Sequence, residues 1–335
     1  MKVMVTGGAG YIGSHCVLDL LKKNHDVVVV DNLSTGHRET VDTLRRYGNV
    51  GFYEADLRKP EQLERPFNEN KDLDAVIHFA AYSQVGESVR DPQKYYMNNV
   101  YGSLNLLNQM IKHNVDKIVF SSTAATYGNP ITETIDENHP QNPINPYGKT
   151  KLTIERMMDD YREPYGIRSA RLRYFNVAGA DSQGRVGEWH EPETHIIPKA
   201  LKAAISGNPF PLYGDDYKTP DGTCIRDYIN VEDLANAHLL ALDYLDKGGE
   251  TDFFNLGTNT GNSVKEVIDE CEDVTGRKIN IEMNGRRAGD PDRLVANNAK
   301  AKRVLNWNPQ RDLRYSIETA YNWEKNRGKV TQPLG

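Results

Sequence analysis

The first half of the sequence alternates short, continuously apolar runs with longer amphipathic stretches. The centres of two runs, Val27–Val30 and Ala75–Ile77, contain no polar position. Strands covered on both faces have this composition, whereas strands with one wet face alternate apolar and polar residues. We therefore predict six buried strands, at Lys2–Thr6, Asp26–Asp31, Val50–Glu54, Ala75–Phe79, Lys117–Ser121 and Ser169–Tyr174.

Helical patterns between these strands predict a βαβα order and a parallel, doubly wound, Rossmann-like α/β sheet. After about residue 178 the regular alternation of strands and helices ends. Loops rich in Gly, Pro and charged residues surround shorter elements there, with predicted helices near Asp233–Leu245 and Ser263–Thr275. We predict a Rossmann-like dinucleotide-binding domain at 1–178. A smaller mixed α/β substrate-binding lobe is predicted at 179–335. This prediction allows some elements of the lobe to join the first sheet.

Composition narrows the class of partner and compartment. The net charge is −6 in 335 residues, which argues against a nucleic-acid partner, because binding a phosphate backbone needs a basic face. Cys16, Cys224 and Cys271 lie far apart without CxxC spacing, which favours a reducing cytoplasm. The start lacks a signal-peptide pattern, and no apolar run reaches the length of a membrane span. We expect a cytoplasmic globular protein.

A glycine-rich turn follows the first predicted strand. The run from Thr6 to Gly13 satisfies both GxGxxG and GxxGxxG before a helix begins, and includes Gly7, Gly10, Tyr11, Ile12 and Gly13. Such glycines let the backbone approach a pyrophosphate, which the helix N-terminus then binds. A lone glycine motif also occurs in tight βα turns that bind no ligand.

The context of the turn favours NAD. Asp31 ends the second strand, 18 residues after Gly13. A carboxylate there accepts from a ribose 2′-hydroxyl and repels a 2′-phosphate, which favours NAD over NADP. Further residues that end strands at the same edge are expected to border the cofactor: Asn32, Asp56, Leu57, Phe79, Ala80 and Ala81.

Tyr147 and Lys151 form a YxxxK pair, which places both side chains on one face of a helix. Spacing alone decides nothing, since Tyr321 and Lys325 form a second pair. Position distinguishes them: Tyr147 follows Asn145-Pro146, a typical helix start, and Thr123 lies 24 residues upstream, beyond a strand end. We expect Thr123, Tyr147 and Lys151 to converge where a nicotinamide would lie, and the second pair to be a solvated helix face.

This combination resembles the extended, sugar-nucleotide branch of the short-chain dehydrogenase/reductase superfamily, and within it the UDP-galactose 4-epimerases. The resemblance covers nearly the whole chain, through ordered segments that include VTGGAGYIGSH, VVVVDNLSTG, FSSTAATYG, NPYGKTK, LRYFNVAGA, DGTCIRDYINVEDLA and RRAGDP. It implies reversible inversion of C4 of UDP-glucose and UDP-galactose through a 4-keto sugar, with the hydride held transiently on bound NAD. It also implies a homodimer formed through helices near Pro92–His113 and Tyr147–Tyr165.

The resemblance implies roles residue by residue. Tyr147 would be the acid/base, Lys151 would hold the nicotinamide ribose, and Thr123 would occupy the position of the catalytic Ser or Thr. Asn99, Tyr174 and Phe175 would lie beside the cofactor. The UDP-sugar would be held by Thr123, Asn176, His195, Ile196, Tyr213, Arg226, Arg287, Asp290 and Leu294. We expect Lys151 and a cationic nicotinamide to lower the pKa of Tyr147 from about 10 to about 7, which takes about 4 kcal/mol.

Several alternatives stay open or are disfavoured. The residues after Thr123 are Ala124, Ala125 and Thr126, so the carboxylic acid that a dehydratase needs is missing. Ser83 and His195 depart from the commonest epimerase pattern, which has Lys and Asn there. The segment His190–His195 contains His and Glu residues that resemble metal ligands. The rest of the sequence supplies no ordered set of further ligands, so we expect no metal.

The substrate alternatives are UDP-GlcNAc/UDP-GalNAc, sole or additional, and a UDP-uronic acid. Leu294 stands where a tyrosine restricts the pocket near C2 of the sugar in related enzymes, so we expect some UDP-GlcNAc activity. A uronic acid would want a cation near C6 that the sequence does not reveal. A non-catalytic NAD-binding protein is the remaining alternative, and such proteins usually lose the Tyr or the Lys.

Overall fold

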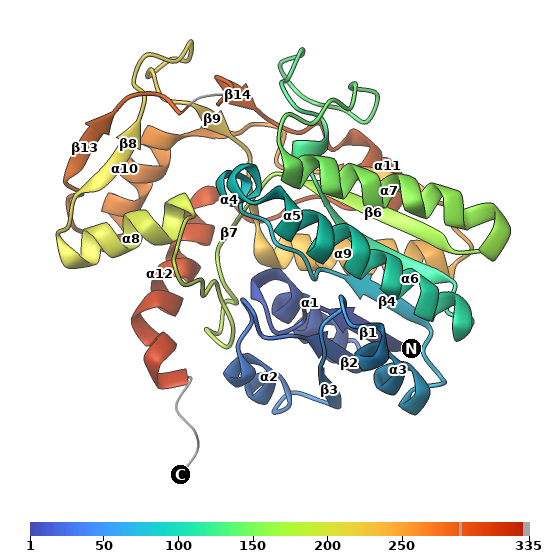
Figure 1. The fold of residues 1–335 in the computed structure, drawn as a ribbon. Coiled ribbons are helices and arrows are strands. Elements are labelled where there is room, and N and C mark those ends of the chain that lie inside the picture. Colours follow the sequence, from blue (N-terminus) through green and yellow to red (C-terminus); the bar gives the residue numbers. More distant parts are fainter. Residues whose placement is uncertain (288–289, 331–335) are drawn as a thin grey trace.

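A seven-stranded parallel sheet organises the computed structural model, which describes residues 1–287 and 290–330 (Figure 1). Its strand order is β11-β6-β5-β4-β1-β2-β3. The strands are β1 (Lys2–Thr6), β2 (Asp26–Asp31), β3 (Val50–Glu54), β4 (Ala75–His78), β5 (Lys117–Thr123), β6 (Arg168–Tyr174) and β11 (Asp252–Leu256). Six of the seven were predicted, and the doubly wound fold class is confirmed.

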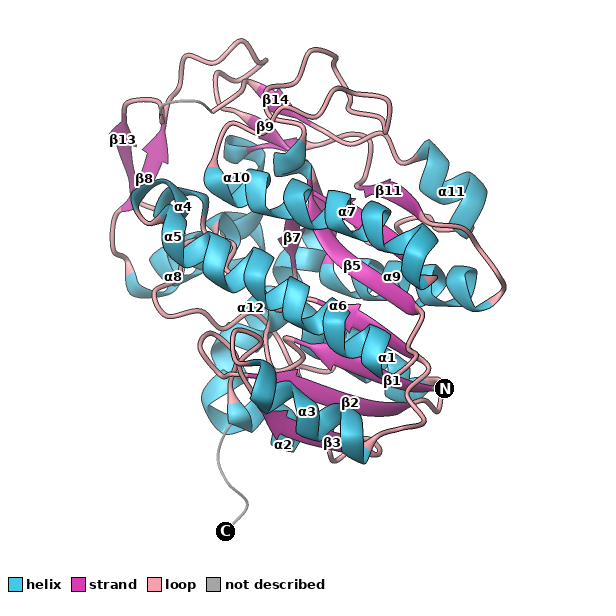
Figure 2. Ribbon diagram, turned by 45° about the vertical axis from the view of Figure 1, so that its right-hand side comes forward, coloured by secondary structure: helices cyan, strands magenta, loops and turns pink. Residues whose placement is uncertain are grey.

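Helices cover both faces of this sheet, as Figure 2 shows. Neighbouring residues of β2 explain why its sequence is apolar throughout: Val27 and Val29 pack into the core on one face, and Val28 and Val30 into the core on the other. The first face carries α1 (Tyr11–Lys22), α2 (Arg38–Leu44), α9 (Val231–Asp246) and α11 (Ala299–Leu305). The second carries α3 (Pro60–Glu69), α6 (Gly102–Lys112) and α7 (Pro146–Tyr165).

The second half of the chain also contributes to the large sheet. β11 pairs in parallel with β6, and α9 packs on α1. The remaining elements form a separate core of the helices α8 (Ile196–Ser206), α10 (Val264–Thr275) and α12 (Leu313–Val330) with three small sheets. Those sheets pair β10 (Tyr228–Asn230) with β7 (Asn176–Ala178), β13 (Ile281–Asn284) with β8 (Phe210–Tyr213), and β9 (Ile225–Arg226) with β12 (Asn262–Ser263) and β14 (Arg293–Leu294).

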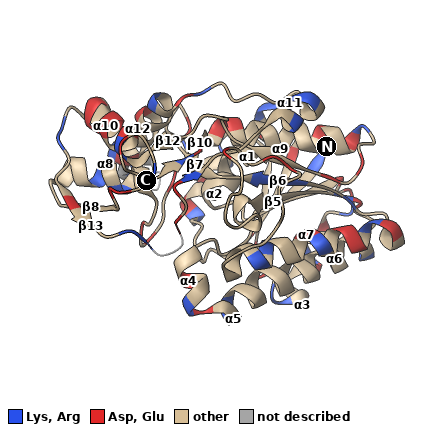
Figure 3. Ribbon diagram, turned by 90° about the horizontal axis from the view of Figure 1, so that it is seen from above, with Lys and Arg blue, Asp and Glu red and all other residues tan. Residues whose placement is uncertain are grey.

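Short helical elements connect the large sheet to its neighbours. Between β4 and α6 lie α4 (Val85–Arg90), α5 (Pro92–Tyr95) and the π-helical turn η1 (Tyr96–Tyr101), and η2 (Ala124–Thr126) follows β5. Acidic and basic residues are interspersed over the outer helices (Figure 3). Among the described residues, no helix combines the length and apolar content needed to cross a bilayer.

Candidate active site

The glycine-rich turn brings the chain backbone close to the carboxyl end of β4. Gly7 has φ +75°, and a Cβ there would lie 2.7 Å from the amide nitrogen of Ala80. A Cβ on Gly13 would lie 2.2 Å from the carbonyl oxygen of Gly7. Helix α1 then begins at Tyr11 with Gly10 as its N-cap and no capping side chain. The turn leaves room and amide donors for a pyrophosphate at this edge.

Asp31 lies at the end of β2 and is 7% exposed. Its two carboxylate oxygens accept from the amides of Ala9 (3.0 Å) and Leu33 (2.8 Å), which ties the glycine turn to the loop after β2. Burial raises the pKa of Asp31 overall, although both amide hydrogen bonds lower it. Each carboxylate oxygen keeps a lone pair for a further donor, such as a ribose hydroxyl.

One cavity of about 380 Å³ runs along the carboxyl ends of the strands and gathers most of the predicted site residues. On the expected cofactor side it is lined by Gly7, Gly10, Tyr11, Ile12, Gly13, Asp31, Asn32, Asp56, Leu57, Phe79, Ala80 and Ala81. On the other side it is lined by Thr123, Tyr147, Lys151, Tyr174, Phe175, Asn176, His195 and Ile196. These residues come from separate parts of the chain and share one cavity.

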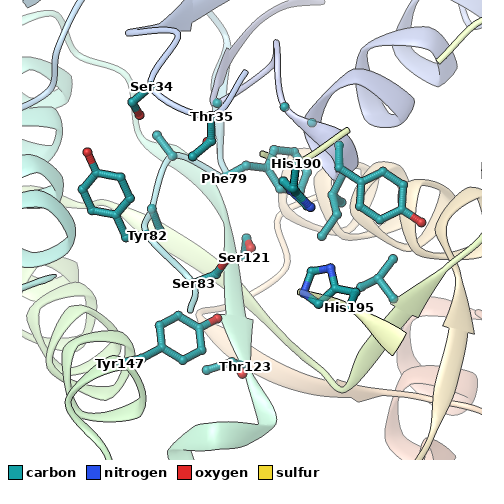
Figure 4. Close-up of a pocket in the computed structure, with 18 of the residues that line it drawn as sticks. Ser34, Thr35, Phe79, Tyr82, Ser83, Ser121, Thr123, Tyr147, His190 and His195 are labelled. Carbon is teal, nitrogen blue, oxygen red and sulfur yellow. The ribbon is translucent and has the colours of Figure 1, made fainter. Parts of the chain in front are cut away.

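Thr123, Tyr147 and Lys151 converge within this cavity. Thr123 is the last residue of β5, two residues beyond the predicted strand end, because it still pairs with Tyr174 of β6. Tyr147 and Lys151 lie in the first two turns of α7, which begins at Pro146; the Asn145 side chain caps it by accepting from the Gly148 amide at 2.8 Å. The hydroxyl of Tyr147 points toward Thr123 (Figure 4).

The electrostatics of Tyr147 differ from the sequence-based expectation. Burial raises its pKa to about 12, although the Thr123 hydroxyl lowers it. Burial has the opposite effect on Lys151, whose pKa it lowers to about 7 although the neighbouring Glu155 carboxylate raises it. The Lys151 Nζ donates to the Ser121 carbonyl at 2.7 Å. The expected pKa near 7 for Tyr147 is therefore not a property of the chain alone, because desolvation outweighs the nearby groups.

Asn99 lies behind the cavity wall. It is fully buried in η1, where its side-chain oxygen accepts from the Tyr82 amide (2.9 Å) and its nitrogen donates to the Tyr82 carbonyl (3.0 Å). It also donates to Thr150 Oγ1 at 3.2 Å. Its contacts fix the loop after β4, and through that loop it shapes the cavity.

The remaining predicted substrate residues lie outside this cavity: Tyr213, Arg226 and Leu294 are on the small sheets, and Arg287 and Asp290 are in the connection between β13 and β14. The Arg226 guanidinium is within 3.4 Å of the Asp290 carboxylate and donates to the Pro291 carbonyl at 2.9 Å. The Arg287 guanidinium lies 4.0 Å from the ring centre of Tyr213. Leu294 of β14 pairs with Arg226 of β9. Ala288 and Gly289, within the RRAGDP segment, lie outside the described residues.

A group that the sequence indicated only in part lies where the chain passes from β7 to α8, because Glu188 joins His190, Glu193 and His195. We call residues 188–195 the strap. Glu188 Oε1 is 3.1 Å from His190 Nδ1 and contacts His195 Nδ1. Although burial opposes both shifts, the two histidines lower the pKa of Glu188 to about 2, and Glu188 with Glu193 raises the pKa of His190 to about 9. Glu188 sits in an irregular segment, so no periodicity pointed to it.

Comparisons with known proteins extend over nearly the whole chain. A family model described as the NAD dependent epimerase/dehydratase family matches residues 3–257. A UDP-glucose 4-epimerase of Halalkalibacterium halodurans is 51% identical over 97% of this chain and 96% of its own. The crystal structure of UDP-glucose 4-epimerase from Brucella ovis in complex with NAD is 47% identical, with a TM-score of 0.91 over 96% of this chain and 98% of that one. The structure of the UDP-Glc/GlcNAc 4-epimerase from Campylobacter jejuni is 42% identical, with a TM-score of 0.85 over 97% and 99%.

Proposed function

Since the chain belongs to the NAD dependent epimerase/dehydratase family, we propose which of its residues perform the reaction of an NAD-dependent UDP-glucose 4-epimerase. The reaction interconverts UDP-glucose and UDP-galactose by inverting C4. One observation carries the assignment: Thr123, Tyr147 and Lys151 line the same cavity as the glycine turn and Asp31.

The residues of the turn fit NAD. A Cβ at Gly7 or Gly13 would collide with the chain's own backbone, so glycine is needed for this tight turn, which lines the cavity at the start of α1. Asp31 lines the cavity with carboxylate lone pairs available, as an adenosine ribose requires. When bound, NAD accepts the hydride of C4 and returns it to the opposite face of the sugar.

Tyr147 is the acid/base of the proposed mechanism. Its phenolate takes the proton from the C4 hydroxyl as the hydride leaves, and it returns that proton once the 4-keto sugar has turned over. Lowering its pKa from about 12 to neutrality takes on the order of 7 kcal/mol, at about 1.4 kcal/mol per unit. Lys151, one helical turn away, contributes as an ammonium when it binds the nicotinamide ribose, and Thr123 orients the C4 hydroxyl.

The lobe at 179–335 holds the UDP group in this proposal. Arg226 and Arg287 bind the diphosphate and Tyr213 contacts the nucleotide, while Asn176 and His195 lie at the cavity side. Because anchoring is remote from C4, the hexose can rotate between the two hydride transfers without the nucleotide leaving.

Incubation of the purified protein with UDP-galactose and no added NAD tests the function. We expect conversion to UDP-glucose, detected by chromatography of the released sugars, because NAD is regenerated in each cycle and stays bound. Absence of product, with NAD shown to be present in the protein, would contradict the proposed chemistry.

We expect additional turnover of UDP-GlcNAc, at a lower rate than UDP-galactose. Leu294 is partly buried on β14 beside Arg226, and it is smaller than the tyrosine expected in strictly glucose-specific relatives. Replacing Leu294 with tyrosine should lower kcat/KM for UDP-GlcNAc about tenfold while leaving UDP-galactose turnover nearly unchanged. Product from UDP-GlcNAc at equal rates in both proteins would show that this position does not read the C2 substituent.

The active form is a homodimer in this proposal, built on the helical face near Pro92–His113 and Tyr147–Tyr165. Tyr96, Met97 and Tyr101 of η1 are 41%, 46% and 37% exposed, an unusual density of large apolar groups on one turn. We expect Met97→Glu to convert the dimer to a monomer in light scattering. Met283→Glu is the matched control, since Met283 is 50% exposed on β13, far along the chain; dissociation by both variants would refute the assignment.

We also propose a cytoplasmic location. Cys16, Cys224 and Cys271 are all free and buried. Three unpaired thiols suit a reducing compartment better than an oxidising one.

A further inference from the structure

The strap carries a second chemical site beside the cavity. Four side chains, Glu188, His190, Glu193 and His195, each bring one ligand atom to a common point, and these atoms all lie within 4.8 Å of one another. The proposed epimerase mechanism uses none of the carboxylates, and it uses His195 only for its place at the cavity wall. His190 and His195 both line the cavity (Figure 4).

Three of the separations between these groups are close to those of a tetrahedral metal site. Zinc bonds of about 2.0–2.2 Å to imidazole nitrogen and carboxylate oxygen place neighbouring ligand atoms about 3.4 Å apart. In the strap, His190 Nδ1 is 3.1 Å from Glu188 Oε1 and 3.8 Å from Glu193 Oε2. His195 Nδ1 is 3.9 Å from Glu193 Oε1. The Glu188–His195 contact is shorter than this spacing and the widest separation, within 4.8 Å, is longer, so an ion enters with shifts of about 1 Å in those side chains.

The donor set suits a borderline divalent cation. Two imidazoles select Zn²⁺ and its first-row neighbours over Mg²⁺ or Ca²⁺, which prefer oxygen alone. Two carboxylates balance the double positive charge of the ion, so the filled site is neutral. Glu188 is 7% exposed, and a buried carboxylate needs such compensation.

Contacts outside the group already hold its members in place. The Trp323 indole donates to the Glu188 carbonyl at 2.8 Å. Glu193 Oε1 accepts from the amides of Thr194 (2.7 Å) and His195 (2.9 Å). Trp189 stacks on His37 with ring centres 3.6 Å apart, which fastens the strap to the loop after β2. A site whose ligands are oriented in advance loses less entropy on binding the ion.

We propose that Glu188, His190, Glu193 and His195 bind one Zn²⁺-like divalent cation, which fastens the strap along the cavity. With four protein ligands the site is closed, so the ion is structural and touches no reacting atom. The alternative is an ion-pair network of the same four groups that binds no metal. The proposal depends only on the strap, so it stands or falls separately from the epimerase reaction.

Metal titration of the NAD-loaded protein tests the site. The holoprotein is dialysed against a chelator and then against metal-free buffer, and ZnCl₂ is added in a calorimeter. We expect one equivalent to bind. The variants His190→Gln and Glu193→Gln should each bind Zn²⁺ at least about tenfold more weakly. Loss of a hydrogen-bond partner of a metal ligand already weakens metal binding by about that factor, and loss of the ligand itself weakens it at least as much. Retained NAD absorbance shows that each variant is folded.

Glu191→Gln is the matched control. Glu191 lies between the proposed ligands on the same strap, but its carboxylate accepts from the Trp189 indole at 3.0 Å and is not a member of the group. We expect it to bind Zn²⁺ as the wild type does. Absence of saturable binding to the wild type would establish the ion-pair network instead. Equal affinities of the wild type and His190→Gln would place any bound zinc elsewhere, and either result overturns the proposal.

Discussion

Replacing Tyr147 with phenylalanine is expected to lower kcat for UDP-galactose conversion about 10³-fold. The phenol is the group that moves the C4 proton, and a positioned acid/base contributes 10²- to 10⁴-fold. The change removes one oxygen atom from a ring that faces Thr123 in the cavity, so the fold and the glycine turn stay intact (Figure 4). Bound NAD should remain at wild-type stoichiometry, as measured from its absorbance after denaturation.

The second YxxxK pair supplies the control for that prediction. Tyr321 and Lys325 lie on α12, where the Lys325 Nζ is 4.2 Å from the Tyr321 ring centre, so the spacing is preserved away from the cavity. Tyr321→Phe should leave kcat unchanged. Wild-type turnover by Tyr147→Phe would remove the proposed acid/base, and equal losses in the two variants would indicate a general effect of destabilisation.

The large sheet was predictable because its strands have an unusual composition. Val27–Val30 is apolar at each position, since alternate residues enter the two cores on opposite faces. The start of α7 was also predictable, because Asn145 and Pro146 are the residue types that helix N-termini favour, and the structure places its first residue at Pro146. Both features depend on the residue types of a few consecutive positions, so they can be recognised from a short stretch of sequence.

Features that depend on distant parts of the chain escaped the sequence. The sequence allowed elements of the second half to return to the sheet but did not identify β11, which joins next to β6 from almost eighty residues away, and the two-residue strands β9 and β14 carry no periodicity. No residue pattern indicated that Asn99, which is expected beside the cofactor, also binds the loop after β4 through its amide. The pKa of Tyr147 depends on burial by several elements at once. Each of these outcomes is decided by packing in three dimensions.

Replacing Glu155 with glutamine is expected to lower the free energy of unfolding by about 3–5 kcal/mol, because it leaves Arg173 as an uncompensated buried charge. Both side chains are 2% exposed. Arg173 Nε donates to Glu155 Oε1 at 2.9 Å, and its second arm pairs with Oε2. Urea unfolding followed by circular dichroism measures the change. Glu163→Gln, an exposed position on the same helix, should stay within about 0.5 kcal/mol of the wild type.

A double replacement and a pH series separate charge from packing in this pair. Glu155→Leu combined with Arg173→Met removes both charges and should recover most of the loss, since apolar pairs can replace buried ion pairs. Burial alone would raise the pKa of Glu155, but Arg173 and Ser122 hold it below the ordinary 4.5. The native protein therefore binds fewer protons than the unfolded chain at acidic pH, and the stabilisation is complete above 4.5 and disappears as the pH falls through the native pKa. The difference between wild type and Glu155→Gln should shrink over that range, and a difference that stays constant with pH would assign the loss to packing.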